Sequence, residues 1–167
     1  NRTSKQRIAT LKKLHKAVLN NRDAFKEALY NDFRKHPSEV DMTEIYVITS
    51  EIKHAISNLR RWMSPQKVET PLSLMGSSSW IHYEPKGVVL IISPWNFPVN
   101  LTFGPLVSAI AAGNCAIIKP SENTPHASAL MSKIIKENFD EKEIAIYEGD
   151  AEMAQALLAL PFNHIFF

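Results

Sequence analysis

The sequence predicts an α/β protein with N-terminal helices, a β-hairpin arm, and part of an open parallel sheet with helices on both faces. Three observations support this prediction. Apolar residues recur at helical spacing in residues 1–65, a Gly-Ser turn divides two strand-like runs in residues 66–84, and apolar strands alternate with helical stripes in residues 85–167. Such alternation favours a parallel sheet with right-handed crossovers.

The first 65 residues predict three helices that bury one apolar stripe each. Asn20-Asn21 separates the first two, and Ser38 is expected to N-cap the third. The third helix should run for about two dozen residues and end near Ser64-Pro65. In order, the stripes consist of Ile8, Leu11, Leu14 and Val18; of Phe25, Ala28, Leu29 and Phe33; and of Met42, Ile45, Ile48, Ile52, Ile56, Leu59 and Met63.

Residues 66–84 predict an antiparallel hairpin. Its first strand is expected to include Val68, Leu72 and Leu74, which alternate weakly, and residues 80–83 return after the turn at Gly76. An arm of this kind would leave Trp80 or Leu74 in need of cover from another chain.

From residue 85, the sequence alternates between strands and helices. Strands are expected over residues 87–92, 115–119, 144–147 and 164–167, and helices over residues 101–112, 124–138 and 151–160. The run from Gly87 to Ile92 is apolar throughout and rich in β-branched residues, which is typical of a strand buried on both faces of a sheet. Gly113 is suited to end the first of these helices.

Polar residues follow two of these strands at their carboxyl ends, where open α/β sheets bind ligands. After the first strand, the sequence Pro94-Trp95-Asn96-Phe97-Pro98 forms a turn stiffened by two prolines. The uncharged N–H donors of Asn96 suit an oxygen that becomes negative during a reaction. The alternative is that Asn96 is an ordinary turn residue.

Lys119 ends the second strand, because the following proline favours extended geometry before it. The Lys119 ammonium and the Glu122 carboxylate could together hold the hydroxyls of a ribose. The alternative is a surface ion pair of little energetic value.

Two segments, residues 94–98 and residues 109–122 (AIAAGNCAIIKPSE), closely resemble the N-terminal half of the cofactor-binding domain of aldehyde dehydrogenases. The resemblance covers nearly the whole chain, and Asn100-Leu101-Thr102 is most similar to the class 3 branch, which handles fatty and aromatic aldehydes. It implies a Rossmann-like sheet whose first part is residues 85–167, an oligomerisation arm in residues 66–84, NAD or NADP as cofactor, and a homodimer or higher oligomer. It makes Asn96 the catalytic oxyanion donor and implies cofactor contacts by Ile92, Ser93, Pro94, Trp95, Lys119, Ser121 and Glu122.

The same resemblance implies a reaction in which a cysteine thiolate adds to the aldehyde, hydride leaves to the nicotinamide, and a Glu-activated water hydrolyses the thioester. The family's nucleophilic cysteine and base glutamate lie beyond position 167, so this chain alone is expected to be inactive. Cys115, the single cysteine, begins a strand at the wrong end of the sheet for catalysis. No G-x-G-x-x-G turn is present; the family places its pyrophosphate at a helix after the strand that starts at His164.

Composition narrows the function further. The chain has 167 residues, a net charge of +2 and 45% hydrophobic residues, which describes an ordinary globular protein. The cations of its basic first half are spread over three helices, which favours solvated helix faces over nucleic-acid binding. The six histidines have no metal-ligand spacing, and no apolar run approaches the roughly 20 residues of a membrane span.

The single cysteine favours a cytoplasmic location. The absence of an initiator Met suggests a trimmed or partial chain, and its end within a strand is expected to leave a sheet edge that self-associates. Two alternatives stay open at this point. One is an acylating relative that passes the acyl group to coenzyme A or reduces an acyl phosphate. The other is a non-catalytic module that binds a partner through its helices or its arm.

Overall fold

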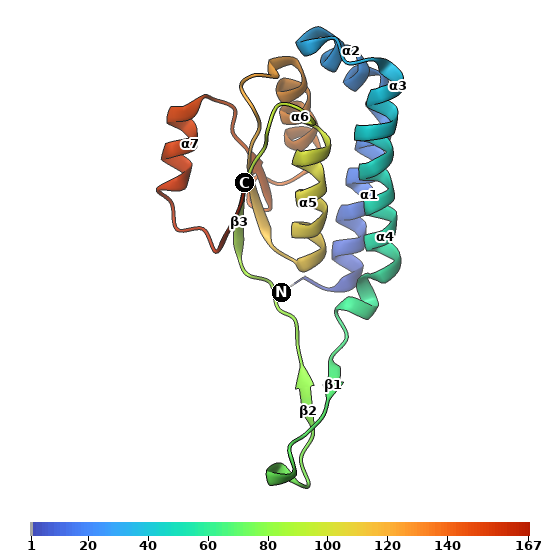
Figure 1. Cartoon of the computed structure of the whole chain (residues 1–167), viewed down its shortest axis with the longest axis vertical. Coiled ribbons are helices and arrows are strands. Elements are labelled where there is room, and N and C mark those ends of the chain that lie inside the picture. Colours follow the sequence, from blue (N-terminus) through green and yellow to red (C-terminus); the bar gives the residue numbers. More distant parts are fainter. Residues whose placement is uncertain (1) are drawn as a thin grey trace.

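The computed structural model, which describes residues 2–167, has a four-stranded parallel sheet at its centre (Figure 1). Its strands are β3 (Val88–Ile92), β4 (Cys115–Lys119), β5 (Ile144–Ile146) and β6 (His164–Phe166). Helices α5 (Asn100–Ala112) and α6 (Pro125–Asn138) cover one face, and α7 (Ala151–Leu158) lies on the other (Figure 1). The predicted α/β class with a parallel sheet and helices on both faces is confirmed.

The strands lie in the order β5-β4-β3-β6. The chain therefore steps from β3 to β4 to β5 in one direction, and then crosses back to place β6 on the free side of β3. The strand order reverses between β3 and β6. In open α/β sheets, ligands bind outside the carboxyl ends of the strands at such a switch point. The turn of residues 94–98, which leaves the end of β3, lies beside it.

The N-terminal region forms α1 (Ser4–Asn20), α2 (Arg22–Phe33), α3 (Pro37–Val40), the π-helical turn η1 (Asp41–Ile45) and α4 (Tyr46–Trp62). Helices α1 and α4 pack against α5, and α2 packs against α6. Together they bury one face of the α5–α6 layer. The largest fully buried side chains come from both regions: Leu11, Leu14, Phe25, Leu29, Ile48, Ile52, Leu59, Leu90, Ile91, Phe103, Leu106 and Ile110.

Two predictions about the third helix were wrong. The N-cap is His36 rather than Ser38, because Pro37 takes the first helical position and the His36 ring accepts a hydrogen bond from the Ser38 N–H. Met42 is 70% exposed and does not belong to the core. The π-helical turn η1 explains this, since a wider turn changes the phase of the apolar stripe before Ile45.

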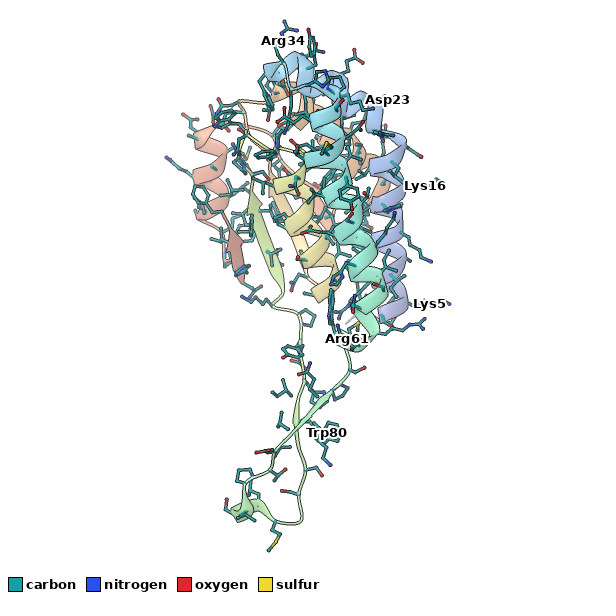
Figure 2. The ribbon with its side chains drawn as sticks, turned by 45° about the vertical axis from the view of Figure 1, so that its right-hand side comes forward. Lys5, Lys16, Asp23, Arg34, Arg61 and Trp80 are labelled. Carbon is teal, nitrogen blue, oxygen red and sulfur yellow. The ribbon has the colours of Figure 1, made fainter. Side chains whose placement is uncertain are left out.

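The arm is a short antiparallel hairpin of β1 (Gln66–Val68) and β2 (Ser79–Ile81). The expected first strand was too long, because Leu72 and Leu74 lie in the 3₁₀ turn η2 (Leu72–Leu74). Pro71 precedes that turn and has no N–H to donate to a partner strand. The arm projects from the amino end of β3, opposite the end at which α2 and α3 lie (Figure 1), and carries the half-exposed Trp80 (Figure 2).

Candidate active-site edge of the sheet

The two polar segments predicted from the sequence meet at the carboxyl edge of the sheet. Strands β3 and β4 pair with Ile92 opposite Lys119, and the Ser93 N–H donates to the Lys119 carbonyl oxygen over 3.0 Å. Ser93 and Lys119 are both buried. The parallel register therefore places the start of the Asn96 turn directly beside the Lys119 segment.

Lys119 and Glu122 form an ion pair through the lysine Nζ and the glutamate Oε2. The lysine side chain is 4% exposed and the glutamate side chain 45%, so the pair extends from the sheet edge into solvent. The hydrogen bond from Lys119 lowers the pKa of Glu122, with a smaller contribution from a backbone N–H. Both interpretations of Lys119 and Glu122, a ribose site and a simple ion pair, are compatible with this contact.

The hydroxyl groups of Ser93 and Ser121 differ in their bonding. The Ser121 hydroxyl accepts a hydrogen bond from the Asn123 N–H over 3.2 Å and supports the turn after β4. The buried Ser93 hydroxyl has no hydrogen-bond partner within residues 2–167. Because nearly all buried polar groups are paired, an unpaired hydroxyl at this edge is a candidate contact for a ligand.

Asn96 lies on the exposed part of the turn, and its side-chain amide makes no hydrogen bond within residues 2–167. The turn is held at its downstream end, where the Thr102 hydroxyl donates to the Pro98 carbonyl oxygen over 2.5 Å. Upstream of Asn96, the half-exposed ring of Trp95 packs edge-on against Phe33, with 6.4 Å between the ring centroids. The amide of Asn96 is therefore free to bind a ligand, on a turn anchored at both sides.

The N-termini of α5 and α6 are capped by carboxylates from the N-terminal region. Glu44 Oε2 accepts a hydrogen bond from the Asn100 N–H over 2.7 Å at the start of α5. Asp32 Oδ2 accepts from the Ala127 N–H over 2.9 Å at the start of α6. A helix N-terminus attracts anions through its free N–H groups and its dipole. In both helices, a side chain of the protein already occupies that position.

Helix α7 is capped by its own N-cap residue, since the Asp150 carboxylate accepts from the Glu152 N–H over 3.0 Å. Each of the three crossover helices in residues 2–167 therefore begins at a carboxylate. Phosphate binding at a helix N-terminus depends on unpaired N–H donors and a positive potential. A carboxylate already takes up both at each of these three N-termini. Sequence analysis missed the roles of Glu44 and Asp32, because neither residue is near the helix it caps in the sequence.

Three other features of the described structure add nothing to this sheet edge. Cys115 begins β4 at the amino end of the sheet, as predicted, and is partly exposed. No group of three or more His, Cys, Asp or Glu side chains gathers as potential metal ligands among residues 2–167. A groove of about 930 Å³ lies between α4, α5, β3 and β6 and is lined by none of the predicted site residues. Within residues 2–167, no helix combines the length and the apolar character that crossing a membrane requires.

Comparisons with known proteins agree with this architecture. Residues 1–166 match the family model described as "Aldehyde dehydrogenase family". The chain is 46% identical over 157 residues to the 4,4'-diaponeurosporen-aldehyde dehydrogenase of Staphylococcus aureus, and the match covers 94% of this chain and 34% of that protein. It is 39% identical over 166 residues to aldehyde dehydrogenase family 3 member B1 of Bos taurus, and this match covers 99% of the chain and 36% of that protein. The second relative confirms the class 3 resemblance.

A solved structure described as the substrate-bound state of Staphylococcus aureus AldH is similar at a TM-score of 0.97 and 44% identity. That similarity covers 99% of this chain and 36% of the other. The chain thus spans about a third of the length of the curated relatives that it matches. Since the family match runs through the N-terminal helices, the arm and the sheet, this chain belongs to the aldehyde dehydrogenase family.

Proposed function

We propose that this chain carries the oxyanion donor and part of the cofactor site of an NAD(P)-dependent enzyme that oxidises aldehydes to carboxylic acids. The pairing of β3 with β4 supports the proposal most strongly, because it joins the Asn96 turn to the Lys119 segment at one sheet edge. Asn96 is the catalytic residue of this chain. The proposed cofactor contacts are Ile92, Ser93, Pro94, Trp95, Lys119, Ser121 and Glu122.

The side chains at this edge fit the ribose of NAD or NADP. An ammonium has three N–H donors, and Glu122 accepts one from Lys119, so donors remain for ribose hydroxyls. The unpaired Ser93 hydroxyl adds a further polar contact. The cofactor's pyrophosphate does not fit the start of α5, α6 or α7, where carboxylates already lie. This agrees with a phosphate site at a helix that follows β6, as the family resemblance implies.

The proposed chemistry requires one contribution from this chain at the reacting carbonyl. When a cysteine thiolate adds to an aldehyde, the carbonyl oxygen becomes negative, and the Asn96 amide donates a hydrogen bond to it. NAD or NADP, held by the residues named above, would supply the hydride acceptor, and water would hydrolyse the thioester that remains. The thiolate and the base for water come from residues beyond position 167. They do not include Cys115, which lies at the other end of the sheet.

Asn96→Ala in the complete protein tests the proposal. Loss of one oxyanion donor typically lowers kcat by about 10²–10³, so steady-state NAD(P)H formation should slow by that factor while the cofactor Kd stays near the parent value. Asn58→Ala on α4 is the matched control, because the Asn58 side chain bonds to residues of its own helix, and it should leave both constants unchanged. An Asn96→Ala enzyme with normal kcat and a weaker cofactor Kd would refute the catalytic assignment.

The remaining proposals concern organisation. Residues 1–65 form a helical region, residues 66–84 an oligomerisation arm and residues 85–167 the first part of the cofactor-binding domain. The exposed apolar side chains of the arm, Leu72, Leu74, Met75 and Trp80, support its role in pairing with a second copy. A cytoplasmic location stays a prediction based on the single cysteine.

A further inference from the structure

Beneath the Asn96 turn lies a fully buried ion pair. Lys35 Nζ and Glu44 Oε1 are 2.6 Å apart, and their side chains are 2% and 0% exposed. Burial raises the pKa of Glu44, while the Lys35 ammonium and the backbone N–H groups of Asn100 and Val99 act in the opposite direction. Replacing a buried ion pair by well-packed apolar residues is often neutral or stabilising. Stability alone is therefore a poor explanation for this pair.

Two departures from regular helix bring the pair together. Arg34, at the end of α2, has φ +62°, a left-handed conformation that residues other than glycine rarely adopt. It lies at the end of the molecule opposite the arm, and the next residue, Lys35, is buried (Figure 2). Glu44 belongs to the π-helical turn η1, and such turns occur frequently at functional sites. Each partner of the buried ion pair therefore lies in or next to a segment of unusual backbone conformation.

The pair holds the segment that follows Asn96. Glu44 accepts the Asn100 N–H through the oxygen that Lys35 does not contact, over 2.7 Å. The Lys35 ammonium lies 4.0 Å from the centroid of the Phe97 ring, a cation–π contact that gains strength when buried. Phe97 is adjacent to Asn96, and Asn100 begins α5. One carboxylate and one ammonium therefore fix the turn at two points.

We propose that Lys35 and Glu44 are positioning residues for the Asn96 amide. By holding Phe97 and the start of α5, they keep the turn in the one conformation in which the amide faces a developing oxyanion. The inference rests on the function proposed for Asn96. It predicts a separation of effects, because Lys35 and Glu44 bond to each other and to Asn100, whereas Lys119 bonds to Ser93 and Glu122. Losing the buried pair should impair the chemical step and spare the cofactor.

The test uses Lys35→Met, Glu44→Leu and the double variant in the complete protein, since leucine has no oxygen to accept the Asn100 N–H. Each single variant leaves one buried charge without its partner and should lower both Tm and kcat. The double variant removes both charges, so Tm should return to within a few degrees of the parent. The kcat of the double variant should stay about 10- to 100-fold below that of the parent, because a small misplacement of a catalytic group causes a loss of this size. Its cofactor KM should stay within about twofold of the parent value.

The matched control is Asp41→Asn, on the same π-helical turn as Glu44. Asp41 pairs with Arg22 over 2.6 and 2.8 Å. Within the described residues, its side chain makes no hydrogen bond to the Asn96 turn, residues 94–98. If η1 acts through stability alone, Asp41→Asn should lower kcat as the Glu44 variant does. If the inference is correct, Asp41→Asn keeps the parent kcat.

A readout independent of activity is hydrogen exchange at the Asn100 amide, which should become faster in the double variant and stay unchanged in Asp41→Asn. A double variant that regains kcat together with Tm, or keeps slow exchange at Asn100, overturns the positioning role. Asn96→Ala in parallel separates the two proposals. If that variant keeps a normal kcat, the proposed function fails; if it loses kcat while the double variant does not, the positioning inference alone fails.

Discussion

The burial of Lys119 distinguishes its ion pair from an ordinary surface ion pair. Its ammonium is almost completely buried at the sheet edge, whereas its partner Glu122 is half-exposed. An exposed ion pair contributes little to stability, and desolvating an ammonium is costly. Because the pKa of Glu122 is lowered, its contribution to stability is present above its ordinary pKa and is lost as the pH falls through the lowered value. The Glu122 carboxylate is therefore charged throughout the neutral range.

Lys119→Ala in the complete protein should weaken cofactor binding and spare the chemistry. Loss of one or two charged hydrogen bonds should raise the cofactor KM from a few-fold to about a hundredfold, while kcat at saturating cofactor changes little. Cofactor titrations of the variant and the parent measure this. Lys133→Ala, which removes an exposed lysine 4.0 Å from Glu137 on α6, is the control. An unchanged KM would assign Lys119 to the ion-pair interpretation.

At the scale of elements, α5 is held at both ends by charges from the N-terminal region. Glu44 lies at its first N–H groups, and the buried Arg7 donates through Nη1 to the Ala111 carbonyl oxygen over 2.9 Å. An anion at the start and a cation at the end both match the helix dipole. Gly113 ends the helix with φ +87°, and a Cβ added there would lie 2.5 Å from the Arg7 guanidinium. Helix α5, which begins directly after the Asn96 turn, cannot shift without breaking one of these contacts.

Gly113→Ala should destabilise the protein more than backbone strain alone explains. A left-handed conformation costs about 1–2 kcal/mol for a residue with a Cβ, and displacing Arg7 should add about 1.5 kcal/mol, a charge-assisted hydrogen bond. Urea unfolding gives the free energy of unfolding for this comparison. Gly76→Ala is the matched control, since Gly76 also has a positive φ but nothing within 4 Å of the added Cβ. Equal losses for the two variants would contradict the Arg7 contact.

At the scale of the whole molecule, the arm and the sheet edge leave apolar surface uncovered. The edge strand β6 pairs with β3 on one side, and Ile165, Phe166 and Phe167 are all exposed. The arm exposes Leu72 and Trp80 at the other end. Unprotected strand edges and large apolar patches promote pairing with another chain.

The purified 167-residue chain should neither turn over aldehydes nor remain monomeric. The single cysteine lies at the amino end of β4, away from Asn96, and removing a nucleophile costs several orders of magnitude in rate. An NAD(P)H-forming assay with a long-chain and an aromatic aldehyde, together with the mass in solution, tests both statements. Ordinary turnover would contradict the first, and a monomer at high concentration would contradict the second. Trp80→Ser shows whether association uses the arm or the β6 edge.

The sequence by itself determined the α/β class, the parallel strands of the sheet and the proline-braced turn at residues 94–98. These features follow from patterns among near neighbours, such as a run of β-branched residues or a proline after a strand. The same reasoning missed the π-helical turn η1, because a single wide turn leaves the overall helical spacing almost unchanged. It also overextended the first strand of the arm.

The tertiary structure alone decided what holds the candidate site. Strand order placed β6 beside β3 and so located the switch point. Glu44, Asp32 and Arg7 reach their helix ends across 56, 95 and 104 positions of sequence. A charged residue on a helix looks the same in the sequence whether it faces water or caps a distant helix. The difference arises when packing removes water and leaves backbone groups of a distant helix within reach of each charge.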